Sequence, residues 1–141
     1  MSTFVYFAYG SNLNLKDMKE RCPSGVVIGK GILKDYRLVY RGSENASYLN
    51  VERKEGESVP IGIWQIDECD LASLDCYEGY PELYYKKEIA VETDNGTVKG
   101  MIYIMNEGYP VHKPEDSYRK TCMEGYRDFG FDIEILKRSE K

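Results

Sequence analysis

The sequence is poor in the residues on which metal-dependent and nucleophilic enzymes rely. Its 141 residues include one histidine, His112, and no Cys-x-x-Cys pair. Metal sites usually draw on closely spaced Cys and His ligands, so no metal centre is expected. His112 lies in a loop between Pro110 and Pro114, where a surface position is favoured over a catalytic one.

The four cysteines give no sign of a disulfide framework. Cys69 and Cys76 lie two helical turns apart, which is too far for a disulfide within one helix, and Cys22 and Cys122 are distant from both. We expect all four to be small buried hydrophobic side chains.

A long apolar run, a block of basic residues and a secretory leader are also missing. The net charge is −5, and charged residues of both signs are scattered along the chain, which argues against a nucleic-acid partner. No stretch is apolar for long enough to span a bilayer, and the first residues lack the features of a signal peptide. We therefore expect a cytoplasmic protein without a membrane partner, folded as a single domain over residues 1–141.

Apolar runs and turn residues predict a mixed order of strands and helices. Strands are expected over 4–8, 26–29, 31–33, 36–40, 48–51, 59–66, 84–91 and 98–104. Helices are expected over 15–22, 67–78 and 114–129, the last two ended by Gly79 and Gly130. A polar loop is expected around 41–45, a charged turn over 52–58, and a short strand or surface packing over 133–136.

This order excludes one large fold class and favours another. It has too few alternating strand–helix units for a doubly wound parallel sheet. The Asn95-Gly96 pair between two strand-like runs is a strong hairpin signal. The pattern fits a strongly curved or closed β structure with helices packed outside it.

The segment Tyr9–Leu13 joins the first apolar strand to a helix that Asn14 can cap. Gly10 allows another group to approach the backbone closely, and free N–H groups in such a turn point outward together. Ser11 and Asn12 add side-chain donors, so the segment can bind a small anion. The other interpretation is a plain connecting turn, which the spacing alone favours because short glycine turns are common.

Glu78 interrupts the apolar stripe of the second long helix. Leu71 and Leu74 mark that stripe, and four residues further the stripe reaches Glu78, just before Gly79. A carboxyl group there faces the core or a cleft, and both burial and the helix dipole raise its pKa. Such a group suits proton transfer near neutral pH. The alternative, which periodicity favours equally, is a solvent-facing glutamate at a frayed helix end.

Several segments resemble those of one known family, in the same order along the chain. They are Phe7–Leu13, similar to a YGSN signature, Val59–Trp64, Leu74–Tyr80, similar to an LD-x-x-EG segment, Tyr84–Lys86, Pro114–Tyr118 and Glu124–Tyr126. On these segments the chain resembles the gamma-glutamylcyclotransferase-like family, which includes AIG2-like proteins and gamma-glutamylamine cyclotransferases. In length it is nearer to the gamma-glutamylamine branch. The resemblance implies an α+β fold, a small mixed parallel and antiparallel β-barrel with flanking helices and a cavity at one end.

The resemblance also implies a reaction. The α-amine of a γ-glutamyl substrate attacks its own γ-carbonyl, and 5-oxoproline and a free amine or amino acid are released. Glu78 is then the general acid and base, and the Tyr9–Leu13 turn holds either the substrate α-carboxylate or the developing oxyanion. Because the substrate supplies the nucleophile, neither metal nor cofactor is required, and the partner is a small γ-glutamyl molecule.

Two assignments stay open at this level. Tyr118, on the last long helix, either hydrogen-bonds substrate or packs in the core with its hydroxyl at the rim. The main alternative to an enzyme is a binding module of the same fold that holds a small ligand without turnover. Thirteen tyrosines also allow an interaction protein with a tyrosine-rich surface. The sequence is compatible with a monomer or a homodimer.

Overall fold

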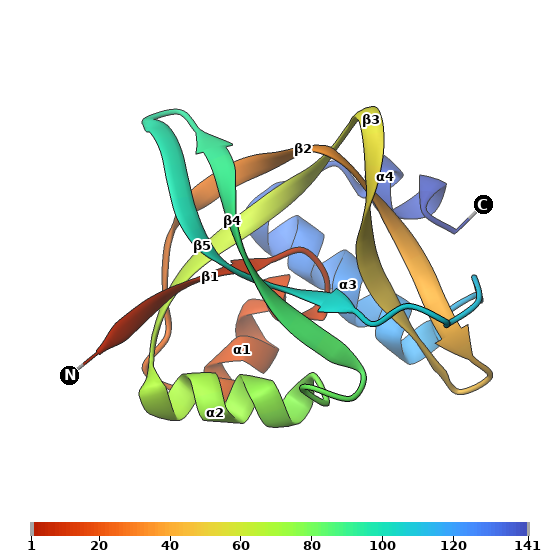
Figure 1. Ribbon diagram of the computed structural model, residues 1–141, viewed down its shortest axis with the longest axis horizontal. Helices are drawn as coiled ribbons and strands as arrows, with labels where there is room; N and C mark the ends of the chain where they lie inside the picture. The colour runs from red at the N-terminus through yellow and green to blue at the C-terminus, as the bar shows by residue number, and fades with distance from the viewer. Residues whose placement is uncertain (1, 141) are drawn as a thin grey trace.

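A closed barrel of five strands forms the centre of the computed structural model, which describes residues 2–140 (Figure 1). The strands are β1 (Thr3–Ala8), β2 (Val26–Ser43), β3 (Ala46–Asp67), β4 (Tyr84–Thr93) and β5 (Gly96–Met105). They follow one another around the barrel in the order β1-β3-β2-β4-β5. All neighbours are antiparallel except β1 and β5, which pair in parallel at Tyr6 and Met101 and close the barrel. The mixed barrel implied by the resemblance is therefore confirmed.

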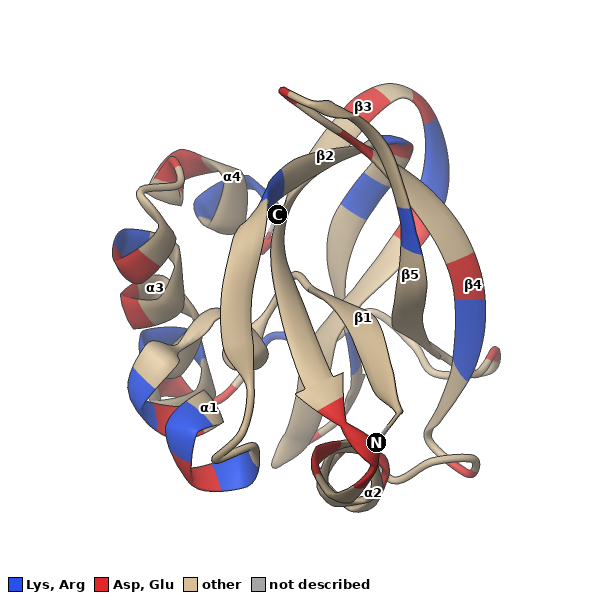
Figure 2. Cartoon of the chain, turned by 90° about the vertical axis from the view of Figure 1, so that its left-hand side faces the viewer, with Lys and Arg blue, Asp and Glu red and all other residues tan. Residues whose placement is uncertain are grey.

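Helices pack on the outside of this barrel. They are the 3₁₀-helix η1 (Ser11–Leu13) and the α-helices α1 (Leu15–Arg21), α2 (Glu68–Tyr77), α3 (Asp116–Phe129) and α4 (Ile133–Arg138). Figure 2 shows α1, α3 and α4 along one side of the barrel and α2 across one end, near the start of β1. None of the helices within residues 2–140 is both long enough and apolar enough to cross a membrane.

The predicted helix boundaries follow from caps that the structure contains. Asn14 accepts the N–H of Asp17 at the start of α1, and Asp67 and Asp70 exchange hydrogen bonds as a capping box at the start of α2. Gly130 ends α3 in the left-handed conformation with φ +71°. These local bonds satisfy N–H groups that a helix end would otherwise leave unpaired.

The charged turn predicted over residues 52–58 is wrong. Strands β2 and β3 instead pair as one long hairpin, from Val26 opposite Gln65 to Ser43 opposite Ala46, with register shifts after Val27 and Lys34. Most side chains of 52–58 are exposed. Glu52, Arg53 and Ser58 pair with β2, whereas the register skips residues 54–57. The charged stretch is therefore an irregular insertion within a long strand rather than a turn between two strands.

Three further expectations need correction. Residues Ile133–Leu136 form the first turns of α4 rather than a strand, because the Asp132 carboxylate accepts the N–H of Glu134. Helix α3 begins at Asp116, two residues after Pro114. Of the cysteines, Cys22 and Cys122 are buried as expected, whereas Cys69 and Cys76 are exposed.

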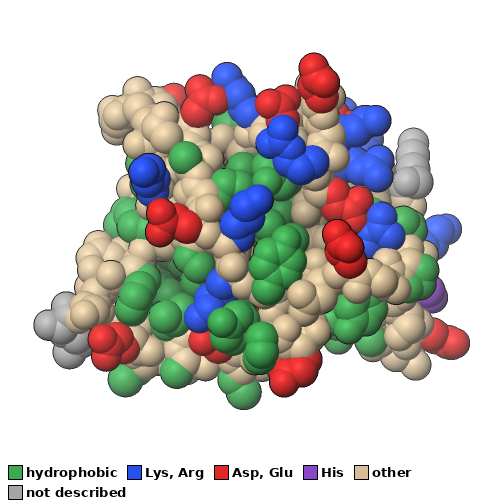
Figure 3. All heavy atoms as spheres, in the orientation of Figure 1, with side chains coloured by type: hydrophobic (Ala, Val, Ile, Leu, Met, Phe, Trp, Pro, Cys, Tyr) green, Lys and Arg blue, Asp and Glu red, His purple; other side chains and the backbone are tan. Residues whose placement is uncertain are grey.

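The basic and acidic side chains are mixed on the visible surface, as the sequence indicated. On the face shown in Figure 3, Lys and Arg alternate with Asp and Glu around a central area of hydrophobic side chains. This face carries no broad area of one sign.

Close packing between α3 and η1 fixes the segment that follows β1. A Cβ atom added to Gly125 of α3 would lie 2.7 Å from the backbone nitrogen of Asn14 and 2.8 Å from the carbonyl carbon of Leu13. The side-chain amide of Asn14 also donates to the carbonyl of Thr121 in α3, at 3.1 Å. Only glycine allows the helix backbone to approach this turn so closely.

Candidate active site

A hollow beside η1 brings the Tyr9–Asn12 segment and Glu78 together. We call its deeper part the inner chamber, of about 20 Å³, which is lined by Tyr6, Tyr9, Gly10, Ser11, Asn12, Leu49, Glu78, Tyr84, Tyr103 and Tyr118. Its wider part, the outer chamber, of about 290 Å³, is lined by Ser11, Tyr48, Cys76, Tyr77, Glu78, Gly79, Leu83, Tyr84 and Tyr118. Because Ser11, Glu78, Tyr84 and Tyr118 line both chambers, the two parts adjoin at Glu78.

The last turn of α2 holds Glu78 against the barrel. Leu74 is fully buried, and the N–H of Glu78 donates to its carbonyl at 2.8 Å. Asp75 accepts the hydroxyl of Tyr103 at 2.5 Å and the ammonium of Lys86 at 3.1 Å, which ties the helix to β5 and β4. Gly79 then takes φ +65° and turns the chain away. Glu78 therefore ends the helix at a fixed position.

The carboxyl group of Glu78 has the raised pKa that its position predicted. Burial raises it from 4.5 to about 7, while the positive charge of Arg21 and a hydrogen bond from Asn12 limit the rise. That hydrogen bond runs from Nδ2 of Asn12 to Oε1 of Glu78 over 3.2 Å. A carboxyl group with this pKa can accept and release a proton near neutral pH.

The turn opposite Glu78 carries N–H groups that its own hydrogen bonds do not use. In η1, the N–H of Leu13 donates to the carbonyl of Gly10 and the N–H of Asn14 donates to the carbonyl of Ser11. The N–H groups of Ser11 and Asn12 take no part in these bonds, as is normal for the first residues of a helical turn. They are the donors that the sequence predicted for an anion.

Gly10 lies close to two neighbouring side chains. Its φ is −133°, outside the left-handed region. A Cβ atom would lie 3.3 Å from Cδ1 of Leu49 and 3.4 Å from the hydroxyl oxygen of Tyr118. The absence of a side chain therefore lets Tyr118 and Leu49 close over the turn, which is the close approach that the sequence indicated.

The structure places Tyr118 with its ring packed among other tyrosines and its hydroxyl at the cavity, as the core alternative predicted. Its ring packs edge-on against Tyr40 and Tyr48, and its hydroxyl lines the cavity and accepts the N–H of Leu49 at 3.2 Å. The hydroxyl of Tyr84 donates to the carbonyl of the same Leu49 at 2.7 Å. Burial holds the pKa of both phenols well above the usual value, so both stay neutral.

The structure brings together six of the seven site residues that the sequence named. Tyr9, Gly10, Ser11, Asn12, Glu78 and Tyr118 all line the inner chamber. Leu13 does not: its side chain is fully buried in the core, next to Gly62 and Gly125. The turn points Leu13 inward because its N–H closes the 3₁₀ bond to Gly10.

Other residues of the site were missed from the sequence. Tyr6 and Arg21 both contact the Asn12 side chain, and Tyr84 and Tyr103 come from strands far away in the chain. Arg21 lies three residues after the buried Met18, so helical spacing could have predicted that both side chains lie on the same face of α1. Nothing local in the sequence indicates that β4 and β5 end at this cavity.

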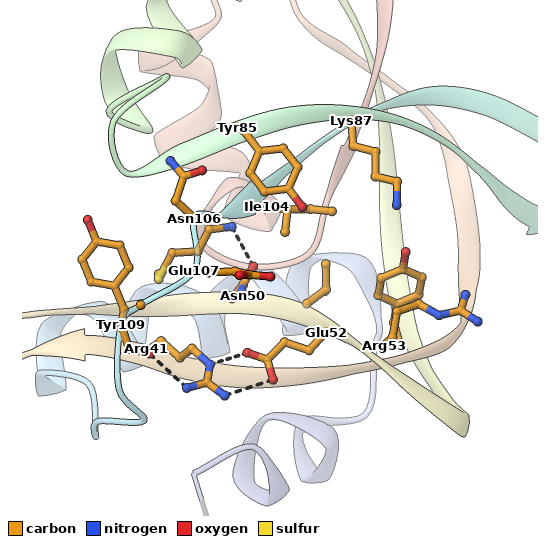
Figure 4. A pocket seen from close by; sticks show the side chains of 14 residues that line it. Arg41, Asn50, Glu52, Arg53, Tyr85, Lys87, Ile104, Asn106, Glu107 and Tyr109 are labelled. Atoms are coloured by element: carbon orange, nitrogen blue, oxygen red, sulfur yellow. Dashed lines mark hydrogen bonds and ion pairs between the residues drawn. The ribbon is translucent and has the colours of Figure 1, made fainter.

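A larger groove, of about 450 Å³, lies on the other face of the same strands (Figure 4). The groove is lined by Asn50, Tyr85 and Ile104. The residue before each of them lines the inner chamber, since successive side chains of a strand point to opposite faces; these are Leu49, Tyr84 and Tyr103. Three polar side chains of the groove have hydrogen-bond partners among the residues that line it. Arg41 hydrogen-bonds both carboxylate oxygens of Glu52, and Oδ1 of Asn50 accepts the N–H of Met105 at 2.9 Å. Since it contains neither Glu78 nor the η1 turn, the groove is not the candidate site.

Within residues 2–140 no three His, Cys, Asp or Glu side chains are grouped so that they could hold a metal ion.

Comparison with known proteins identifies similar sequences. The family model described as gamma-glutamyl cyclotransferase, AIG2-like, matches residues 6–126. The chain is 28% identical over 145 residues to a human gamma-glutamylcyclotransferase, an alignment that covers 96% of this chain and 77% of the relative. A bovine gamma-glutamylcyclotransferase is 26% identical over 144 residues, with the same coverage.

Solved structures show the same fold. One described as gamma-glutamyl cyclotransferase superposes with a TM-score of 0.86 at 26% identity, over 99% of this chain and 87% of the other. An AIG2-like protein from Mus musculus superposes with a TM-score of 0.64 at 23% identity, over 83% of this chain and 90% of the other. The second likeness concerns the fold alone.

Proposed function

Because the chain belongs to the gamma-glutamyl cyclotransferase, AIG2-like family, we propose that it releases 5-oxoproline from a γ-glutamyl amide with Glu78 as acid and base. The observation that carries the proposal is the meeting of Glu78 with the η1 turn in one chamber. Oε1 of Glu78 lies 3.2 Å from Nδ2 of Asn12, and the free N–H groups of the turn belong to Asn12 and its neighbour Ser11. An acid–base group thus faces anion-binding donors.

The reaction needs no second substrate. The α-ammonium group of the substrate loses a proton to the Glu78 carboxylate, and the free amine attacks the γ-carbonyl carbon. A new C–N bond closes the five-membered ring, and the original γ C–N bond breaks. The α-nitrogen loses two protons in turn, one before the attack and one as the ring amide forms, and Glu78 passes both to the departing nitrogen, which leaves as an ammonium group. Since the attack is intramolecular, holding the substrate in a reactive conformation supplies much of the rate, and proton transfer remains for the protein.

The N–H groups of Ser11 and Asn12 have two suitable targets, the substrate α-carboxylate and the oxyanion that develops on the γ-carbonyl. A 4-aminobutyryl amide, which lacks the α-carboxylate but can cyclise in the same way, distinguishes them. If the turn holds the carboxylate, this analogue loses most of its affinity. If the turn holds the oxyanion, the analogue keeps a KM and a kcat close to those of the γ-glutamyl amide.

The outer chamber provides room for the rest of the substrate. Its volume, about 290 Å³, is close to the lower end of the range of small-molecule pockets. Four tyrosines contribute to its wall, Tyr48, Tyr77, Tyr84 and Tyr118. The hydroxyl of Tyr118 accepts the Leu49 N–H, which leaves its own proton available for a substrate oxygen.

The experiment that tests the function measures 5-oxoproline release from a panel of γ-glutamyl amines and γ-glutamyl dipeptides. We expect Glu78→Gln to lower kcat by at least about 100-fold, the usual contribution of a positioned acid–base group, with the fold retained by circular dichroism. Glu82→Gln, an exposed carboxylate four residues further on, is the matched control and keeps full activity. Turnover retained in Glu78→Gln would remove the mechanism.

The competing possibility is a binding module of the same fold. It predicts that γ-glutamyl compounds bind, by calorimetry, without any release of 5-oxoproline from the wild-type protein. The same panel therefore separates the two functions and identifies the leaving group.

A further inference from the structure

Arg21, the last residue of α1, is held on three sides beside the candidate site. Only 19% of its side chain is exposed. The guanidinium carbon lies 3.7 Å from the centre of the Tyr77 ring, and Nη2 lies 3.8 Å from Oδ2 of Asp17. Nη1 donates to Oδ1 of Asn12 at 2.8 Å. The cation therefore contacts the site through the Asn12 side chain.

This contact fixes which end of the Asn12 amide faces Glu78. An arginine has donors only, so Asn12 must present its oxygen to Arg21 and its NH₂ group to the other side. There Nδ2 donates to the hydroxyl oxygen of Tyr6 at 2.8 Å and to Oε1 of Glu78 at 3.2 Å. The reversed amide would place an acceptor against the carboxylate and donors against Arg21.

We propose that Arg21 is a positioning residue of the reaction. Acting through Asn12, it holds Oε1 of Glu78 and leaves Oε2 as the oxygen that exchanges the proton with substrate. The inference rests on the proposed role of Glu78 as acid and base. Within residues 2–140, Oε2 has no hydrogen-bond partner, whereas Oε1 is held by Asn12.

The electrostatic surroundings single out Arg21 in the same way. The titratable groups that act on or face Glu78 come from six elements or their ends: Tyr6, Tyr9, Tyr77, Tyr84, Tyr103, Tyr118, Cys122 and Arg21. Burial raises the pKa of the phenols and of the Cys122 thiol, so all of them are neutral near neutral pH. Of these eight groups, Arg21 is therefore the one that carries a charge, and Asp17 lies beside it.

The test measures the pKa of Glu78 directly, by carboxyl ¹³C NMR titration without substrate, together with kcat/KM against pH. In Arg21→Met the pKa of Glu78 rises by about one unit or more, as expected on removing a nearby opposite charge. The fall of kcat/KM at low pH moves to higher pH by the same amount. At a pH where Glu78 is fully ionised in both proteins, kcat of Arg21→Met is still about tenfold or more below that of the wild type, because Arg21 no longer orients the Asn12 amide.

Two further variants separate this role from simple structural support. Arg21→Lys keeps a charged donor and restores the pKa of Glu78 to near the wild-type value. Lys19→Met removes an exposed positive charge from the same helix and leaves the pKa unchanged. Arg21→Gln, which is neutral but still carries donors, replaces Arg21→Met if that variant does not fold, and it also raises the pKa.

An unchanged Glu78 pKa in both neutral variants, or an equal rise in Lys19→Met, would overturn the inference. So would a raised pKa with no loss of kcat at high pH. The NMR titration does not depend on the proposed function, whose failure appears separately as 5-oxoproline release that survives in Glu78→Gln.

Discussion

The hydroxyl groups of Ser11 and Tyr77 lie 3.0 Å apart and join the turn after β1 to the last residue of α2. The next residue on each side, Asn12 and Glu78, forms the next contact, at 3.2 Å. Two consecutive residues of the turn thus bind two consecutive residues at the helix end. This pairing of segments 66 residues apart sets the distance between the carboxyl group and the N–H donors.

Removing the first of these contacts tests whether the pairing matters for catalysis. Tyr77→Phe keeps the ring beneath Arg21 and deletes the hydrogen bond to Ser11. We expect a loss of about 1 kcal/mol in the free energy of unfolding, typical of one hydrogen bond, and a several-fold lower kcat because the turn is less firmly placed. Tyr80→Phe, on the exposed loop after Gly79, is the control and changes neither denaturant unfolding nor kcat.

The pH dependence of activity follows from the raised pKa of Glu78. Burial raises this pKa to about 7, and the base must be ionised to accept the substrate proton. We expect kcat/KM to fall tenfold per unit of pH below about 7 and to level off above it, as general-base catalysis requires. Initial rates of 5-oxoproline release from pH 5 to 9 provide the measurement. A limb near pH 4.5, the ordinary value of a glutamate, would contradict the assignment.

The same pKa shift predicts how stability depends on pH. The folded protein holds the Glu78 proton up to about pH 7, whereas the unfolded chain releases it near 4.5. Unfolding between these values releases a proton, so Glu78 makes the fold progressively less stable as pH rises through this window. The full effect is at most about 3 kcal/mol. The measurement is urea unfolding of the wild type and of Glu78→Gln at several pH values. The free energy of unfolding of Glu78→Gln minus that of the wild type should increase from pH 4.5 to 7 and stay constant above pH 7.

Packing of α3 on η1 predicts a sharp contrast between two glycines. The Cβ of Gly125→Ala would lie within 2.8 Å of two backbone atoms of Leu13 and Asn14, which cannot move without displacing the turn. We expect a loss of about 2 kcal/mol or more in the free energy of unfolding, typical of overpacking, together with a lower kcat. Gly29→Ala, with nothing within 4 Å, is the matched control and should unfold like the wild type.

Local chemistry made several parts of the fold predictable. The Asp67 cap, the Gly79 stop and the Asn95-Gly96 turn depend on neighbours within a few residues, and each lies where it was expected. One error lies where strand pairing on both sides of a charged stretch overrides the turn that its polarity suggests. Within 52–58, Glu52, Arg53 and Ser58 pair with β2, and the register skips residues 54–57.

The sequence by itself determined that a carboxyl group stands at the end of α2 in line with the stripe of Leu74, because helical periodicity carries that stripe on to Glu78, but it left a buried and a solvent-facing position equally favoured. It also determined that a glycine turn with spare N–H groups follows β1, since Gly10 and the Asn14 cap act locally. Only the tertiary structure decided that these two segments meet, that Leu13 points into the core, and that Arg21 reaches Glu78 through Asn12. Closure of the barrel and the docking of α3 on the turn create those contacts, and both depend on residues far apart in the chain.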